Sequence, residues 1–229
     1  MKIFSIITFL IFCTFLSKQD SDSHYFKTVD NNIETGDHNC LTTITLTGSV
    51  ETYDTQVLSS RPNNNFNYSV SNTVYSWTEN NIESDKYILI NFDWPDGMDS
   101  NSDVCLAYLS LYFNPTDPYE PFDFHYGTDN GFIISRITQS WNPATVTWNT
   151  RPNTTATNEI TLPAPTSNTQ NYTNIDVRFL VKDMFSNNSP HGLQIRMENP
   201  HSYRGLLFGS STNSNSAIHP KLVLAYNVN

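Results

Sequence analysis

The chain has 229 residues, which suits a single domain, and its 22 acidic against 12 basic residues give a formal net charge of −10. An acidic surface repels phosphate backbones, so this charge argues against a nucleic-acid partner and disfavours polyanionic polysaccharides. Asn, Ser, Thr and aromatic residues are frequent whereas Lys and Arg are few, which suits strands with polar faces joined by long turns.

The first residues have the pattern of a targeting segment. Met1-Lys2 supplies a positive end, and the apolar run from Ile3 to Leu16 is too short to span a bilayer comfortably, so we expect a signal peptide over residues 1–20. Cys13 leaves a lipoprotein open, the one case in which we expect contact with a membrane. The polar residues 21–40 are expected to be a linker, and residues 41–229 the folded domain.

Two cysteines remain once the targeting segment is removed, Cys40 and Cys105. In an oxidising compartment they are expected to form a disulfide that closes a loop of about 65 residues. The alternative is two unrelated thiols, with Cys105 buried in its own strand.

Short segments with alternating apolar and polar residues recur along the chain. Thr43 to Val50 alternates Thr with Ile or Leu, which predicts a half-buried strand. In Lys86 to Phe92, the residues Tyr87, Leu89 and Asn91 are expected to face one side, and Ile88, Ile90 and Phe92 the other. Further strand candidates are Thr73–Trp77, Cys105–Phe113, Phe132–Ile137, Gly192–Met197, Leu206–Phe208 and Leu222–Tyr226.

In the candidate strand from Cys105 to Phe113, we expect Cys105, Ala107, Leu109 and Leu111 to point inward. The one helical spacing follows Asp176, where Val177, Leu180, Val181 and Met184 predict one or two amphipathic turns up to Phe185. Many short strands without a long helical period predict an all-β sandwich or barrel.

Ile137 to Pro152 is the most distinctive stretch. Val146-Thr147-Trp148 is β-branched and aromatic, which predicts extended backbone, and Asn-Pro and Arg-Pro pairs on either side predict turns. One interpretation is that Trp141 and Trp148 are core residues that hold a turn. The other is that they form an aromatic platform for a sugar ring.

This stretch also carries a resemblance. Trp, a short spacer, then Val-Thr-Trp-Asn and Arg-Pro resembles the signature of the DNRLRE domain family, which is also classed as carbohydrate-binding module family 96 and as disaggregatase-related. Other segments resemble the family's motifs in the family's order: Asn63–Tyr68, Ile88–Asp93, Ala107–Tyr112, Ile175–Val177, Gly192–Arg196, Phe208–Ser210 and His219–Tyr226. The resemblance implies a jelly-roll-like antiparallel β-sandwich, usually an accessory or surface module of secreted proteins. Some relatives are associated with the acidic polymer alginate, which the negative charge of this chain disfavours.

The acidic loop from Asp93 to Asp103 contains Asp99, Asn101 and Asp103 at alternate positions, a spacing that is typical of calcium ligands. The Gly and the closing Glu of a calcium loop are both missing. The alternatives are therefore a calcium site and a solvated loop; no other cofactor is expected.

A scattered set of Arg and aromatic residues suits sugars, because a ring stacks on the apolar sugar face and a guanidinium reaches hydroxyl groups. The candidate ligand-binding residues are Arg136, Trp148, Arg151, Arg196, Tyr203 and Arg204. The alternative is that these are Arg residues at strand ends and a buried Trp.

Catalytic motifs are not apparent, because the chain lacks a Gly-x-Ser-x-Gly elbow, a His-Glu-x-x-His helix and a phosphate loop. Together with the targeting segment and the strand pattern, the family resemblance leads us to expect a secreted, non-catalytic β-sandwich that binds a polysaccharide or cell-surface glycan. The alternatives are a structural or adhesive extracellular protein that binds a protein partner or its own copies, and a small polysaccharide-degrading enzyme.

Overall fold

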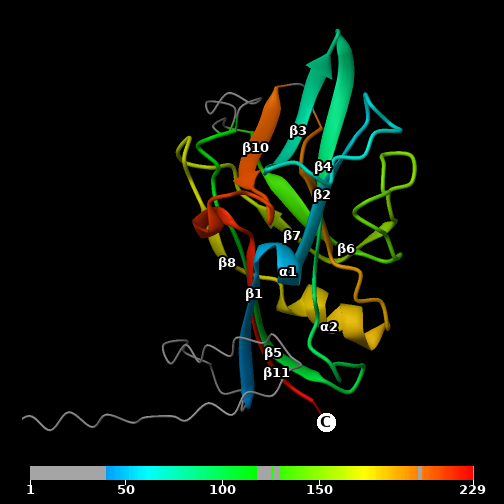
Figure 1. Cartoon of the computed structure of the whole chain (residues 1–229), viewed down its shortest axis with the longest axis vertical. Coiled ribbons are helices and arrows are strands. Elements are labelled where there is room, and N and C mark those ends of the chain that lie inside the picture. Colours follow the sequence, from blue (N-terminus) through cyan, green and yellow to red (C-terminus); the bar gives the residue numbers. More distant parts are fainter. Residues whose placement is uncertain (1–39, 118–124, 126–128, 201–202, 229) are drawn as a thin grey trace, which may run out of the picture.

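Two antiparallel sheets pack against each other in the computed structural model, which describes residues 40–117, 125, 129–200 and 203–228 (Figure 1). The smaller sheet has the order β1-β11-β5-β8, with β1 Thr42–Thr47, β5 Asp103–Leu111, β8 Tyr172–Asp176 and β11 Lys221–Asn227. The expected all-β, jelly-roll-like antiparallel sandwich is confirmed. The expected signal peptide and Cys13 lie outside the described residues, as does the expected linker except for Cys40.

The larger sheet has the order β10-β3-β4-β9-β6-β7, and β2 also pairs with β4. Its strands are β2 Thr52–Leu58, β3 Ser71–Glu79, β4 Ile82–Phe92, β6 Phe132–Ile137, β7 Thr154–Leu162, β9 Leu193–Met197 and β10 Arg204–Gly209. The hairpin of β3 and β4 projects at one end of the molecule, at the top of Figure 1, and β5 and β11 lie toward the other end.

The main core lies between the sheets. From the larger sheet it contains Ile88, Ile90 and Phe92 of β4, and from the smaller sheet Leu109 and Leu111 of β5. Tyr87 and Leu89 instead belong to a second, smaller apolar cluster. The alternation predicted for this strand is therefore confirmed, and β4 is apolar on both faces because each face is covered.

Cys105 corrects the prediction for its strand, because it does not point inward with Ala107. Across β11, Ala225 pairs with Leu106 and Tyr226 pairs with Val104, so Cys105 is the extra residue of a β-bulge. The bulge turns Cys105 to a separate cluster with Leu106 and Ala225. There it forms the expected disulfide with Cys40, with the two Cα atoms 6.2 Å apart.

The predicted amphipathic turns form α2, Arg178–Ser186, which buries Leu180, Val181, Met184 and Phe185. The Asp176 carboxylate accepts a hydrogen bond from the backbone N–H of Arg178 at 3.0 Å, near the start of the helix. The expected strand from Thr43 ends early, at Thr47, because Gly48 has a φ of 76° and begins the short α1, Gly48–Glu51. A short 3-10 helix, Ser216–Ile218, precedes β11. Within the described part of the chain, no helix has the length and apolar character that crossing a membrane requires.

Val146-Thr147-Trp148 is also corrected, because it lies in a series of turns and forms no strand. The backbone N–H groups of Thr145 and Val146 both donate to the Asn142 carbonyl oxygen, which bends the chain around Asn142-Pro143. Val146 is buried with Leu89 and Ile137, and Trp141 and Trp148 pack against them. The turn chemistry on either side therefore prevails over the β propensity of three residues.

His125 is a fully buried titratable group between the rings of Phe113 and Phe208. Its Nε2 lies 3.0 Å from the Gln170 carbonyl oxygen, and its Nδ1 accepts from the Leu207 backbone N–H at 2.9 Å. This pattern fits the neutral ring with its proton on Nε2. Burial lowers the pKa of His125 from 6.5 to about 4.

This burial predicts a loss of stability in mild acid. The unfolded chain takes up a proton on His125 as the pH falls through 6.5, whereas the folded protein does so only near pH 4. The free energy of unfolding that this group contributes is therefore complete above pH 6.5 and falls by about 3 kcal/mol as the pH approaches 4. Urea unfolding at a series of pH values measures the slope. His125→Asn cannot take up the proton, so it should reduce the slope of the free energy of unfolding against pH between pH 6.5 and 4. An unchanged slope would contradict the assignment of this pH dependence to His125.

Candidate functional site

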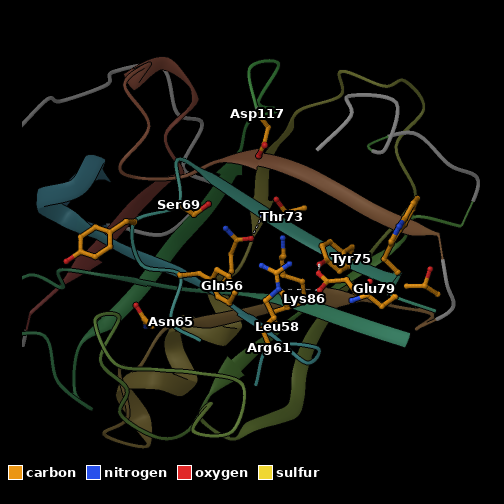
Figure 2. A pocket seen from close by; sticks show the side chains of 15 residues that line it. Gln56, Leu58, Arg61, Asn65, Ser69, Thr73, Tyr75, Glu79, Lys86 and Asp117 are labelled. Carbon is orange, nitrogen blue, oxygen red and sulfur yellow. Dashed lines mark hydrogen bonds and ion pairs between the residues drawn. The ribbon is translucent and has the colours of Figure 1, made fainter. Parts of the chain in front are cut away.

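An open pocket with a volume of about 770 Å³ lies where β2 and β3 separate (Figure 2). β2 pairs with residues 86–92 of β4 and β3 with residues 82–86, so the two strands meet at Lys86, which pairs with both Leu58 of β2 and Tyr75 of β3. Beyond this point β3 leaves β4 and pairs with β10. We call this cavity the β2–β3 pocket; its size falls within the roughly 300–1,000 Å³ that is usual for small-molecule sites.

The Gln56 side chain spans the gap between the two strands. It is buried, its amide donates to the Ser71 carbonyl oxygen, and its oxygen accepts from the Thr73 backbone N–H at 3.2 Å. These bonds satisfy backbone groups that the separation of the strands leaves without a neighbouring strand. Gln56 therefore forms a rigid inner wall of the pocket.

Four aromatic side chains line the pocket: Phe66, Tyr68, Tyr75 and Trp77. Tyr75 and Trp77 are two residues apart on β3 and share a face of the strand. Tyr75 is buried against Leu58, whereas Tyr68 is 88% exposed. Trp77 and Tyr203 pack in a T-shaped arrangement with the ring centroids 4.8 Å apart. The pocket thus combines a fixed aromatic base with an exposed ring of the kind that stacks on sugars.

Ionisable side chains lie beside these rings. Glu79 accepts a hydrogen bond from the Tyr75 hydroxyl at 3.0 Å and forms an ion pair with Arg61, with Arg61 Nε and Glu79 Oε2 3.4 Å apart. The Lys86 ammonium lies 4.5 Å from the centre of the Tyr75 ring. Figure 2 shows Asp117 on the far side of the pocket from Leu58 and Arg61.

The tight turn of the β3–β4 hairpin fixes the position of Trp77 and Glu79. Asn80 and Asn81 have φ values of 51° and 62°, and Glu79 pairs with Ile82. Two consecutive positive φ angles are typical of a type I′ turn, in which Asn is favoured. The two Asn residues therefore set the pairing register of β3 with β4. This register places Trp77 and Glu79 in the pocket lining together with Tyr75.

The turn that contains Trp141 and Trp148 supports the loop between β2 and β3, which carries Tyr68 of the pocket lining. Asn65 donates from its amide nitrogen to the carbonyl oxygens of Pro143 and Val146, at 2.8 and 2.7 Å. The backbone N–H of Asn149 donates to the Pro62 carbonyl oxygen at 3.1 Å. The distinctive stretch of the sequence thus lies behind the pocket loop and holds it in place.

Trp141 and Trp148 make the contacts expected of residues that hold a turn. The Trp141 indole N–H donates to the His191 carbonyl oxygen at 2.8 Å. The Arg151 guanidinium stacks 4.0 Å from the centre of the Trp148 ring system, and Tyr87 packs against it at 4.9 Å. The role of Trp148 and Arg151 in sugar binding stays a prediction.

The other predicted ligand-binding residues fall into separate groups. Arg136 is buried and donates to the Ser189 hydroxyl, and Arg196 forms an ion pair with Glu159 at 3.7 Å. Burial raises the pKa of Tyr87 and the Asp85 carboxylate adds to this shift, whereas Arg151 and Arg196 oppose it. Tyr203 and Arg204 lie at the start of β10, where Tyr203 contacts Trp77 and Arg204 pairs with Asp129 at 2.7 Å. Tyr203 therefore lies next to the lining of the β2–β3 pocket.

Residues 46–226 match the family model described as carbohydrate-binding module family 96. The chain belongs to this family. The match covers both sheets from Leu46 in β1 to Tyr226 in β11, so it confirms the resemblance that the motifs predict. No curated protein matches the chain.

The candidate calcium loop of this family 96 module forms a local turn. Asp99 Oδ1 accepts from the Asn101 backbone N–H at 2.8 Å, and Asp103 forms an ion pair with Lys182 at 3.3 Å. Within residues 40–117, 125, 129–200 and 203–228, no group of three or more His, Cys, Asp or Glu is arranged so that it could hold a metal ion. Calcium binding at Asp99, Asn101 and Asp103 remains a prediction, and a thermal melt with calcium and with a chelator measures it.

Sequence reasoning missed the residues that line the pocket of this module. The sequence predicts a strand that contains Tyr75 and Trp77 and another that contains Lys86, but it indicates no binding role for them. A usable signal is present: aromatic residues alternate along a segment that ends in Glu79-Asn80-Asn81, a hairpin pattern. The separation of β2 from β3, which opens the pocket, leaves no such local pattern.

Proposed function

We propose that this family 96 module is a non-catalytic extracellular protein that binds a polysaccharide or cell-surface glycan in the β2–β3 pocket. Family membership supports a carbohydrate ligand. The observation that carries the choice of site is an open pocket with polar walls whose lining includes the exposed Tyr68 ring and the Trp77 ring system. Aromatic faces cover the apolar side of a sugar, and the polar side chains reach its hydroxyl groups.

The contacts of Glu79 support binding without catalysis. One of its oxygens accepts from Tyr75 and the other pairs with Arg61, so its carboxylate serves the architecture of the pocket. A disulfide between Cys40 and Cys105 supports an oxidising, extracellular compartment, in line with the targeting pattern of residues 1–20.

Removing one stacking ring tests the proposal. Tyr68→Ala should weaken binding to the preferred soluble polysaccharide by about tenfold or more, because an exposed aromatic ring that stacks on a ligand contributes on the order of 1–2 kcal/mol. Affinity electrophoresis against a panel of polysaccharides selects the ligand, and calorimetry measures its dissociation constant. Trp77→Ala should have an effect at least as large.

Tyr53→Ala is the matched control, because Tyr53 is 40% exposed on β2 and lies outside the pocket lining. It should bind like the unchanged protein. Equal binding by Tyr68→Ala and Tyr53→Ala would overturn the proposed site. Release of reducing ends by the purified protein, abolished by Glu79→Gln, would replace the proposal with an enzyme.

A further inference from the structure

We propose that the β2–β3 pocket selects neutral glycans and discriminates against polymers of uronic acids. This inference rests on the proposed function and adds the chemical class of the ligand. It is drawn from the charges in the pocket and from the donor and acceptor character of their side chains.

The ionisable side chains of the pocket lining balance one another. Arg61 and Lys86 are cationic, and Glu79 and Asp117 are anionic. Arg61 is paired with Glu79 at 3.4 Å, and the Lys86 ammonium lies over the Tyr75 ring. The pocket therefore offers no net positive charge to attract a carboxylate, and the whole chain carries a formal net charge of −10.

The chemistry of hydroxyl groups fits this lining better than that of carboxylates. A sugar hydroxyl both donates and accepts hydrogen bonds, so it bonds equally to a carboxylate such as Glu79 and to a guanidinium such as Arg61. An ionised uronate only accepts, and in this pocket it would meet the carboxylates of Glu79 and Asp117. Like charges held close together across a binding site oppose association. The Arg61–Glu79 pair thus supplies directional polar groups without attracting anions.

The neutral polar residues of the lining point to the same class of ligand. Ser69, Thr78 and Asn80 contribute hydroxyl and amide groups along the pocket. Figure 2 shows Asn65 and Ser69 toward one end and Glu79 toward the other, with Gln56, Lys86 and Leu58 between them. A glycan chain that lies along the pocket therefore passes uncharged polar groups near Ser69 before it reaches the ion pair.

Binding of the full protein to neutral and to acidic polysaccharides tests this inference. Soluble glucans, mannans and xylans serve as neutral probes, and alginate and polygalacturonate as acidic ones. The affinity for the best neutral probe should exceed that for either acidic probe by about tenfold or more, and it should change little between low and high salt. Tight, salt-sensitive binding of alginate or polygalacturonate would overturn the inference.

Charge-removing variants show whether the pocket itself makes the distinction. Glu79→Gln keeps an acceptor for the Tyr75 hydroxyl but releases the positive charge of Arg61, so it should raise the affinity for acidic relative to neutral probes by about tenfold. Asp117→Asn should act in the same direction and provides a second variant if Glu79→Gln unfolds. Glu83→Gln is the matched control, since Glu83 is exposed on β4 outside the pocket lining and its removal changes the net charge equally.

The two proposals fail in different ways. An equal shift in Glu79→Gln and Glu83→Gln would mean that the net charge of the chain, not the pocket, sets the preference, which overturns the inference. Tight binding of acidic probes that is lost in Tyr68→Ala would also overturn it while supporting the pocket as the binding site. Binding of neutral probes that Tyr68→Ala leaves unchanged would overturn the proposed function itself.

Discussion

Removing the disulfide should lower the free energy of unfolding by about 4 kcal/mol. The bridge joins Cys40 to Cys105 across a sequence separation of 65, and a loop of that length restricts the unfolded chain by about this amount. In the folded protein the bridge ties Cys40, two residues before β1, to the bulge of β5, so it also holds the edge strand of the smaller sheet. Chemical unfolding of the Cys40→Ser/Cys105→Ala double variant measures the loss.

Treatment with a reductant supplies the control for this prediction. Reduction should lower the stability of the unchanged protein to about that of the double variant and should leave the double variant itself unaffected. Oxidised and reduced forms with the same unfolding midpoint would contradict the prediction.

Replacing Asp54 with alanine should cost about 4 kcal/mol. Asp54 is 6% exposed and accepts three hydrogen bonds, from the Asn72 amide at 2.9 Å, the Ser211 backbone N–H at 2.7 Å and the Ser211 hydroxyl at 3.1 Å. Burial raises the pKa of Asp54, and these three donors oppose that shift. Alanine leaves buried donors without an acceptor, at about 1–3 kcal/mol for each group that no other partner satisfies.

Two further variants separate the hydrogen bonds from the loss of charge. Asp54→Asn keeps the side-chain volume and one oxygen acceptor but places an NH2 group near the donors. It should therefore lower the free energy of unfolding less than Asp54→Ala does. Asp96→Ala removes an exposed acidic residue and should change the free energy of unfolding little. A loss in Asp54→Ala no larger than in Asp96→Ala would show that this network does not hold β2 to β3.

The strands that the sequence predicts are those in which the apolar residues alternate. In β4 the alternation of Ile88, Leu89 and Ile90 places two of them in the main core and one in the second cluster. In α2 the spacing of Leu180, Val181 and Met184 predicts the buried face. These elements are predictable because the spacing of their apolar residues determines which face of the strand or helix is buried.

The elements that were missed follow different rules. β2 contains Asp54 and Gln56, both buried and polar, whose partners lie on other elements, so its pattern shows no apolar face. β7 is an exposed edge strand rich in Thr, and a bulge between Ile134 and Arg136 interrupts its pairing with β6. Cys105 was placed on the wrong face because a bulge inserts one residue and reverses every side chain beyond it.

The proposed site shares residue types with the site predicted from the sequence but lies elsewhere in the fold. The sequence predicts a sugar site built from aromatic and Arg side chains, and the β2–β3 pocket has that composition with different members. Tyr203 of the predicted set contacts a lining residue, Trp77. Trp148 and Arg151 belong to a motif in which the carbonyl oxygens of Pro143 and Val146 accept hydrogen bonds from Asn65 of the pocket lining. Three-dimensional separation of two strands decides the location of the pocket, and a linear motif does not encode it.

A crystal structure of the module with a bound oligosaccharide tests the central claim most directly. The account predicts a sugar ring stacked on Tyr68 or Trp77, with its hydroxyl groups within hydrogen-bonding distance of Arg61 or Glu79. A sugar bound instead beside Tyr87, Trp148 and Arg151, with the β2–β3 pocket left to solvent, would contradict it.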